Sequence, residues 1–388
     1  MTDATSDAPA AAEPAPGFAT RAIRAGEQRD PTTGAHNPPI YQTATFAFET
    51  SDALIGAIAE PLDHFFYSRT ANPTTAALEA KVAALEGAQE ALATSSGMAA
   101  VAIAVMICAQ AGDHVLVDHD LFVISREFFV TECKAMGIEV GFIDVRDPES
   151  LRQGLRPTTK VLFCETLTNP NMWVADVAAL AGFCHGHGVR LVVDNTFLGP
   201  SLFRPVEHGA DLVVHSATKY LSGHGDAVAG VLAGSREDVR AARLKLDSFG
   251  QCLSPFNAWL LMRGIRTLPL RMHRHGENAL VVARFLADHP KVEWVRYAGL
   301  DGHPQRDVAL RQFPDGCGGM LSVKLHGGGE EMKRFADGLR MCDLGVSLGD
   351  VFTLVYPKPR NGNLLRVSVG CEDVGDIVAD FAQSLERV

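Results

Sequence analysis

The sequence lacks the features of several protein classes. No run of apolar residues reaches the length of roughly 20 that a membrane-spanning helix needs, so we expect no membrane insertion. No dense run of Lys and Arg occurs and the formal net charge is −11, so we expect no nucleic-acid partner. Residues 1–17 have neither the basic start nor the apolar stretch of a secretory signal, and their Ala, Pro and acidic composition predicts a disordered tail.

Cysteine and histidine also lack the spacing that is typical of structural sites. The eight cysteines are scattered singly, with no C-x-x-C pair, which favours reduced thiols and a cytoplasmic location. Among the 14 histidines, His185 and His187 form an H-x-H pair, but no cysteine or carboxylate lies at ligand spacing from it. We therefore expect no metal site.

The 388 residues, of which 47% are apolar, suffice for two or three domains with sizeable cores. Residues 18–66 are rich in Pro, Thr and Gly with little periodicity, which predicts an extended arm. Apolar residues then recur at helical spacing between Pro73 and Gly87, with the proline near the start and the glycine just beyond the end, so this segment is predicted to be a helix.

Short β-branched runs, among them KVLFCE, RLVVDN and DLVVHS, alternate with helical stretches from there on. Such a rhythm is typical of a mostly parallel central sheet covered on both faces, which is an α/β fold. The rhythm breaks near Pro255, where a long helical stretch from Phe256 to about His289 and later strands predict a smaller α+β domain. The predicted organisation is a tail (1–17), an arm (18–66), an α/β domain (67–255) and a C-terminal α+β domain (256–388).

Two predicted strand ends carry groups that could act on one ligand. Asp194 ends the run RLVVD, and DLVVHS leads into Lys219. Ligands of open α/β sheets bind outside the carboxyl ends of the strands. A buried carboxylate facing a buried amine suits pyridoxal phosphate (PLP), because the lysine forms an imine and the carboxylate keeps the pyridine nitrogen protonated. By spacing alone, a capping aspartate and a solvated lysine explain the pair better.

The surrounding residues could bind a phosphate. Ser216 and Thr218 place small hydroxyls on both sides of Lys219. Ser95, Ser96 and Gly97 precede an apolar helix, where free backbone N–H groups and the helix dipole favour an anion. A Ser-Ser-Gly turn by itself is usually only a helix cap.

The stretch DLVVHSATKYLSGHGD (211–226) resembles the PLP-lysine signature of the Cys/Met-metabolism enzymes, which include cystathionine γ-synthase, cystathionine γ-lyase, methionine γ-lyase and the O-acylhomoserine sulfhydrylases. The similarity runs in order from about Ala22 to the C-terminus. It implies the PLP-dependent transferase-like fold (aspartate aminotransferase fold type I) and PLP held as a Schiff base on Lys219.

The resemblance also implies individual roles. Tyr67 and Arg69, in YSRTANPTTAALE, would clamp the phosphate of a neighbouring subunit's cofactor, so an obligate dimer is expected, and by resemblance a homotetramer. Within one subunit, SSGMAA gives Gly97 and Met98 as backbone donors to the phosphate. The further implied contacts are Asn169 with the ring oxygen, Asp194 with the ring nitrogen, Arg366 with the substrate carboxylate and Ser347 beside Lys219.

Two departures from the family pattern bear on the substrate. Phe122 stands where the γ-lyases carry a tyrosine credited with proton transfer to the leaving thiol. Its ring could stack on the cofactor, but it has no hydroxyl, and losing a general acid typically costs about 10²- to 10⁴-fold. Residues 350–365 form a shorter segment than the family usually has beside the substrate, so we expect a substrate entrance of different shape.

The motifs most resemble methionine and cystathionine γ-lyases, which implies γ-elimination from a sulfur-containing amino acid such as methionine, cystathionine or homocysteine. The alternative is γ-replacement on an O-acetyl- or O-succinylhomoserine by a thiol, which Phe122 favours because a carboxylate leaving group needs less help. A catalytically silent PLP fold that serves as a binding protein is a third hypothesis, against which the intact Lys219, Asp194 and Arg366 speak.

Overall fold

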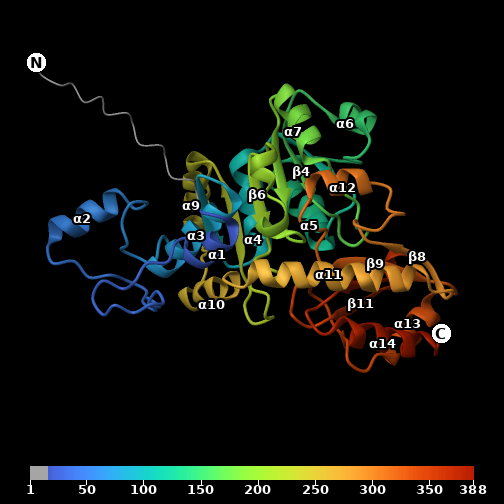
Figure 1. Ribbon diagram of the computed structural model, residues 1–388. Helices are drawn as coiled ribbons and strands as arrows, with labels where there is room; N and C mark the ends of the chain where they lie inside the picture. Colours follow the sequence, from blue (N-terminus) through green and yellow to red (C-terminus); the bar gives the residue numbers. More distant parts are fainter. Residues whose placement is uncertain (1–15) are drawn as a thin grey trace, which may run out of the picture.

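A seven-stranded sheet forms the centre of the larger unit in the computed structural model, which describes residues 16–388 (Figure 1). The strand order is β1-β7-β6-β5-β4-β2-β3; β7 runs antiparallel to both of its neighbours, and the series from β6 to β3 is parallel. The strands are β1 (Glu90–Thr94), β2 (His114–Asp118), β3 (Glu139–Ile143), β4 (Thr159–Glu165), β5 (Arg190–Asp194), β6 (Leu212–His215) and β7 (Gly230–Gly234). The predicted α/β fold with a mostly parallel central sheet is therefore confirmed.

Helices cover both faces of this sheet, and a hydrophobic core lies on each face. Successive residues of β5 show the alternation, since Leu191 and Val193 belong to one core and Val192 to the other. The covering elements are α3 (Pro73–Glu86), α4 (Gly97–Cys108), α5 (Val123–Glu127), the π-helical turn η1 (Phe128–Cys133), α6 (Pro148–Gly154), α7 (Val177–Gly186), α8 (Gly199–Leu202), the 3₁₀ turn η2 (Pro205–His208) and α9 (Arg236–Phe249).

The helix predicted between residues 73 and 87 is present as α3. The residues at its two ends explain where it begins and ends. The Asn72 side chain accepts a hydrogen bond from the backbone N–H of Thr74, and Pro73 occupies the first turn, where its missing N–H costs nothing. Gly87 ends the helix with a φ of 72°, a left-handed conformation that glycine adopts without strain.

A second, mostly antiparallel sheet of five strands, in the order β10-β11-β12-β9-β8, forms the C-terminal unit. The expected smaller α+β unit is thus present, whereas the exact boundaries at residues 66 and 255 stay predictions. From residue 255 onward the elements are α10 (Pro255–Ile265), α11 (Leu268–Ala287), β8 (Val292–Arg296), α12 (Arg306–Gln312), β9 (Met320–Leu325), α13 (Gly329–Gly338), β10 (Asp343–Leu344), β11 (Leu354–Lys358), the 3₁₀ turn η3 (Pro359–Asn361), β12 (Leu364–Ser368) and α14 (Val374–Leu385). Of these, α10 packs on α3 of the larger unit.

The long helical stretch expected between residues 256 and 289 is two helices, α10 and α11. The break falls at Arg266 and Thr267, because Pro269 lacks an N–H and its ring would clash with the carbonyl of Ile265 in a continuous helix. Helix α11 contacts α1 and α8 at one end and β8, β9 and α14 at the other, so it joins the two units (Figure 1).

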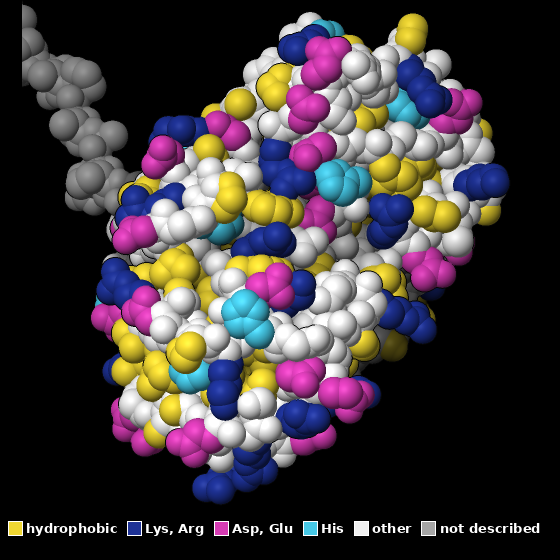
Figure 2. Space-filling model, turned by 90° about the vertical axis from the view of Figure 1, so that its right-hand side faces the viewer, with side chains coloured by type: hydrophobic (Ala, Val, Ile, Leu, Met, Phe, Trp, Pro, Cys, Tyr) yellow, Lys and Arg dark blue, Asp and Glu magenta, His cyan; other side chains and the backbone are white. Residues whose placement is uncertain are grey.

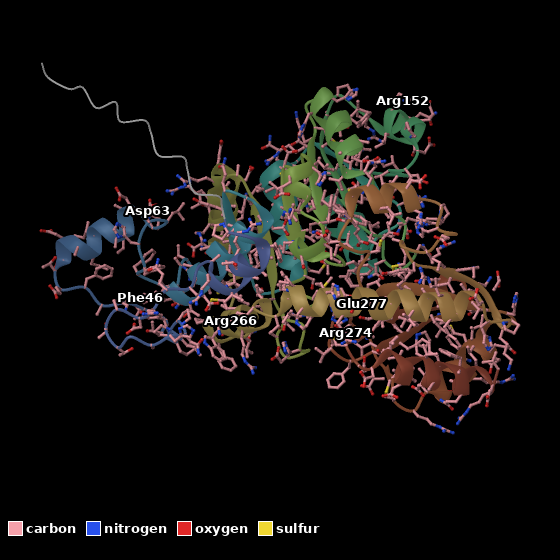
Figure 3. All side chains as sticks on the ribbon, viewed as in Figure 1. Phe46, Asp63, Arg152, Arg266, Arg274 and Glu277 are labelled. Carbon is pink, nitrogen blue, oxygen red and sulfur yellow. The ribbon has the colours of Figure 1, made fainter. Side chains whose placement is uncertain are left out.

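Residues 18–66 form an arm, but the arm is not purely extended. It contains α1 (Phe18–Arg24) and α2 (Ser51–Ala59). Helix α1 packs on α3, whereas α2 lies well away from both sheets, as does Phe46 (Figures 1 and 3). The arm returns to the larger unit at Asp63, which pairs with Arg240 of α9. Most of the predicted tail, residues 1–15, falls outside the described residues.

The surface and the helices bear on two of the expected properties, the charge distribution and the lack of membrane-spanning helices. On the face seen in Figure 2, Lys and Arg are interspersed with Asp and Glu, so this face carries no continuous basic area. Within residues 16–388, none of the helices combines the length and the apolar character that crossing a bilayer requires.

Candidate active site

A cavity of about 400 Å³ lies where the carboxyl ends of β4, β5 and β6 face β11, β12 and the segment before β11. This is the position at which open α/β sheets bind ligands. The cavity is lined by Phe122, Val123, Ile124, Glu165, Leu167, Asn169, Asp194, Thr196, Phe197, Ser216, Lys219, Val346, Ser347, Leu348, Tyr356, Lys358 and Arg366. Seven predicted site residues therefore meet in one cavity: Phe122, Asn169, Asp194, Ser216, Lys219, Ser347 and Arg366.

Lys219 enters the cavity from the turn that follows β6. Its Nζ donates a hydrogen bond to Ser347 Oγ over 2.6 Å. Burial, together with the positive charge of Arg366, lowers the pKa of Lys219 to about 8. A lowered pKa leaves a substantial share of the amine neutral near neutral pH, which is the form that attacks an aldehyde or accepts a proton.

Two carboxylates stand side by side at the ends of β4 and β5, because Glu165 pairs with Asp194 in the strand register. Asp194 Oδ1 accepts hydrogen bonds from Thr196 N (2.9 Å) and Thr196 Oγ1 (2.5 Å). Glu165 accepts from the backbone N–H groups of Phe122 and Asn169, each over 2.8 Å. Burial raises the pKa of both carboxyls, and the nearby Asp194 adds to the shift of Glu165.

Arg366 lies on β12 and is buried, with its guanidinium aimed into the cavity. It donates to Asn169 Oδ1 over 3.1 Å and to the backbone oxygen of Ser347 over 2.6 Å. Its Nε has no hydrogen-bond partner in the described residues, and burial lowers its pKa to about 10. A buried guanidinium whose contacts are all neutral carries an uncompensated charge, so this site favours a carboxylate ligand.

Ser347 has a strained backbone conformation and contacts both Lys219 and Arg366. Its φ is 77°, in the left-handed region that costs a non-glycine residue of order 1–2 kcal/mol. Its hydroxyl meets Lys219 and its carbonyl meets Arg366, so two site residues converge on this one residue.

The predicted phosphate turn lies next to the lysine turn. Ser96 caps α4 by accepting a hydrogen bond from Ala99 N, which places Gly97 and Met98 in the first helical turn with their N–H groups free of helical partners. A side chain at position 97 would come within 2.7 Å of Ser216 Cβ, so only glycine allows this close approach. The Thr218 hydroxyl already exchanges hydrogen bonds with the backbone of Ala229.

Tyr67 and Arg69 lie outside the cavity of their own chain. Both are well exposed, and Arg69 Nε forms an ion pair with Asp247 over 2.8 Å while its guanidinium stacks 5.0 Å from the Tyr67 ring. Within one chain, therefore, they do not meet Lys219. Their contribution to a neighbour's site stays a prediction.

Three titratable residues of the cavity, Glu165, Tyr356 and Lys358, escaped the sequence reasoning. Glu165 ends the predicted strand KVLFCE in the same way as Asp194 ends RLVVD, so the strand-end argument could have found it. Tyr356 and Lys358 lie in the short segment whose shape no motif specified.

The cavity has the donor and acceptor set that PLP needs. A helix N-terminus and Ser216 suit a phosphate, a buried carboxylate suits a protonated ring nitrogen, and an amine with a lowered pKa suits the aldehyde. Fold and site together define a PLP-dependent enzyme of fold type I.

The chain belongs to the Cys/Met metabolism PLP-dependent enzyme family, whose model matches residues 19–386. It is 43% identical to an L-methionine gamma-lyase of Pseudomonas putida, covering 96% of this chain and 98% of that one. It is 39% identical to an O-succinylhomoserine sulfhydrylase of Pseudomonas aeruginosa, covering 95% of each. A crystal structure from Campylobacter jejuni that contains N'-pyridoxyl-lysine-5'-monophosphate matches with a TM-score of 0.91 at 29% identity, covering 95% of this chain and 99% of that chain.

Proposed function

We propose that the protein eliminates the γ-substituent of an α-amino acid, with a sulfur-containing amino acid such as methionine, cystathionine or homocysteine as substrate. The observation that carries the proposal is the convergence of Lys219, Ser347 and Arg366 on one cavity, opposite Asp194. This arrangement offers a base, a carboxylate anchor and a partner for a ring nitrogen in one place.

Arg366 binds the substrate α-carboxylate, with the Asn169 side chain beside it, and so fixes the Cα–H bond near Lys219. Lys219 takes the proton from Cα and then transfers protons at the neighbouring carbons, since its lowered pKa favours the neutral amine and its hydrogen bond to Ser347 Oγ holds it in place. Bound PLP supplies the electron sink that makes the Cα proton removable. Asp194 holds the proton on the ring nitrogen that this sink requires.

Gly97, Met98 and Ser216 hold the cofactor phosphate in this proposal, and Thr218 stiffens the lysine turn through its bonds to Ala229. Asn169 contacts the ring oxygen, and Phe122 packs against the ring face. Because the Phe122 side chain is a hydrocarbon, it excludes water but donates no proton to the leaving group.

The second candidate is γ-replacement on O-acetyl- or O-succinylhomoserine by a thiol, and Phe122 is the observation that favours it. An ester substituent leaves as a carboxylate and needs no proton, whereas a thiolate leaves more readily with one. Lys219 and Arg366 perform the same steps in both reactions. The reactions differ in the γ-substituent that leaves and in whether a thiol then adds in its place.

Product analysis separates the two candidates. We expect purified enzyme to form a 2-keto acid and ammonia from methionine or cystathionine without any added thiol. Product that forms only from O-acetyl- or O-succinylhomoserine together with a thiol would establish the replacement reaction instead. A purified enzyme that turned over none of these compounds would contradict both.

We further propose that the active unit is a dimer, two of which form a homotetramer in the cytoplasm. Three features support this: the outlying arm, the exposed apolar side chains Ile55 and Ile58 on α2, and the position of Arg69 outside its own cavity. The eight free cysteines agree with a reducing compartment.

A further inference from the structure

Strand β11 adds a second cation to the substrate side of the cavity. Tyr356 pairs directly with Arg366 across β11 and β12, and Lys358 follows Tyr356 by two residues, so both side chains belong to the same face of the strand. All three line the cavity. The Lys358 Nζ lies 4.6 Å from the centre of the Tyr356 ring, and the Arg366 guanidinium lies 5.2 Å from the same centre.

Lys358 is half-buried and has no counter-ion of its own. Among residues 16–388, lysine ion pairs form at Lys81, Lys324 and Lys333, and Lys358 makes none. The acid that faces this part of the cavity is Glu165, and both of its oxygens already accept backbone hydrogen bonds. The Tyr356 ring partly compensates the ammonium charge through a cation–π contact, which an anion would compensate better.

The other cationic groups of the cavity each have a partner in the proposed reaction. The substrate α-carboxylate neutralises Arg366, the cofactor takes up Lys219, and the ring nitrogen faces Asp194. Lys358 alone among these cations is left without an ion-pair partner, because the acid that faces it, Glu165, already accepts backbone hydrogen bonds with both of its oxygens. A substrate whose γ-substituent is neutral, such as methionine, offers no anion to the Lys358 ammonium. A γ-substituent that ends in a carboxylate would form an ion pair with it.

We propose that Lys358 binds a carboxylate at the far end of the γ-substituent, so that the enzyme prefers amino-acid substrates with two carboxylates. This inference rests on the proposed function, γ-elimination or γ-replacement, and names the substrate class within it. Lys358 is a specificity residue that contacts the substituent and takes no part in proton transfer. The segment 350–365, which is shorter than in the family, contains β11 and so brings Lys358 to the wall of the cavity.

O-succinylhomoserine and O-acetylhomoserine test the proposal, because both break the same Cγ–O bond and only the succinyl ester has a distal carboxylate. We expect Lys358→Met to raise KM for the succinyl ester about tenfold or more and to leave KM for the acetyl ester and both kcat values within about twofold. Lys358→Arg should restore most of the preference because it keeps the charge. Arg360→Met is the matched control, since it removes an exposed cation from the same segment.

Equal increases of KM for both esters would overturn the proposal, because they would place Lys358 at the α-carboxylate or in the packing of the cavity. Unchanged KM values would overturn it as well. A measurement without turnover keeps the test independent of the proposed reaction: calorimetric binding of 2-aminopimelate and 2-aminoheptanoate, which have equal chain length and no leaving group, to the holoenzyme. Tighter binding of 2-aminopimelate that Lys358→Met abolishes supports the proposal, even if no substrate is turned over; equal binding of the two compounds contradicts it.

Discussion

At the scale of single residues, burial decides what the charged groups of the cavity can do. Lys219, Lys358 and Arg366 all have lowered pKa values, and Asp194 and Glu165 have raised ones, with desolvation as the first cause in each case. Groups of both signs are therefore held closer to neutrality than they would be in water. Sites arranged in this way are suited to exchanging protons near neutral pH.

The lowered pKa of Lys219 predicts how the apoenzyme takes up PLP. Only the neutral amine attacks the aldehyde, so the neutral fraction rises with pH and is half-complete at the pKa, which is about 8 here instead of the ordinary 10.5. We expect the rate of covalent attachment, followed by absorbance, to increase with pH and to level off above about 8. Arg366→Met removes a cation that lowers this pKa, so its profile should shift to higher pH. A wild-type profile still rising steeply at pH 10 would contradict the shift.

At the scale of elements, the sequence predicts those helices and strands whose bounds depend only on neighbouring residues. The caps at Asn72 and Gly87 fix α3, and the β-branched runs give the strands and hence the places of Asp194 and Lys219. The parts that could not be predicted depend on packing between distant segments. Lys358 meets the cavity only because β11 pairs with β12, and no local pattern in residues 350–365 specifies that pairing.

A buried ion cluster attaches the arm to the larger unit. Lys81 of α3 is fully buried and contacts Glu27 over 3.0 Å and the carbonyl of Ala22 over 2.7 Å. Arg266, labelled in Figure 3, also pairs with Glu27. The pKa of Lys81 is lowered by burial, which its contact with Glu27 opposes. The cluster joins residues just after α1 to α3 and to the end of α10.

Removing Glu27 should destabilise the protein, because it leaves the Lys81 ammonium buried without an anion. We expect Glu27→Ala to cost about 3–5 kcal/mol, seen as a lower midpoint of thermal unfolding. Adding Lys81→Met to that variant should recover part of the loss. Glu149→Ala is the control, since its pair with Arg152 is exposed and worth little. If the double variant were no more stable than Glu27→Ala, buried charge would not be the cause.

At the scale of the whole molecule, the proposed phosphate site would be incomplete in a single chain. The cavity contains Lys219, Asp194 and Arg366, whereas Tyr67 and Arg69 lie outside it. The arm that carries the segment before Tyr67 extends away from both sheets (Figure 1). A second copy of the chain would both cover the apolar side of α2 and receive these two residues.

The intersubunit clamp predicts that Arg69→Ala weakens cofactor retention without unfolding the chain. In this proposal the arginine adds positive charge to a phosphate in the neighbouring subunit, whereas its contacts within its own chain are exposed and contribute little to stability. We expect dialysed Arg69→Ala to lose PLP faster than wild type at unchanged circular dichroism. Arg240→Ala, which removes another exposed arginine ion pair of the same region, should retain PLP normally. Full PLP occupancy of Arg69→Ala after dilution would contradict the clamp.

The central claim is that Lys219 holds the cofactor, and borohydride reduction of the holoenzyme tests it most directly. Reduction fixes the pyridoxyl group to the lysine that carries it, and peptide mass spectrometry then identifies that residue. We predict a single modified peptide, containing Lys219, and no label and no turnover in Lys219→Ala. A label on another lysine, together with normal turnover by Lys219→Ala, would contradict the claim.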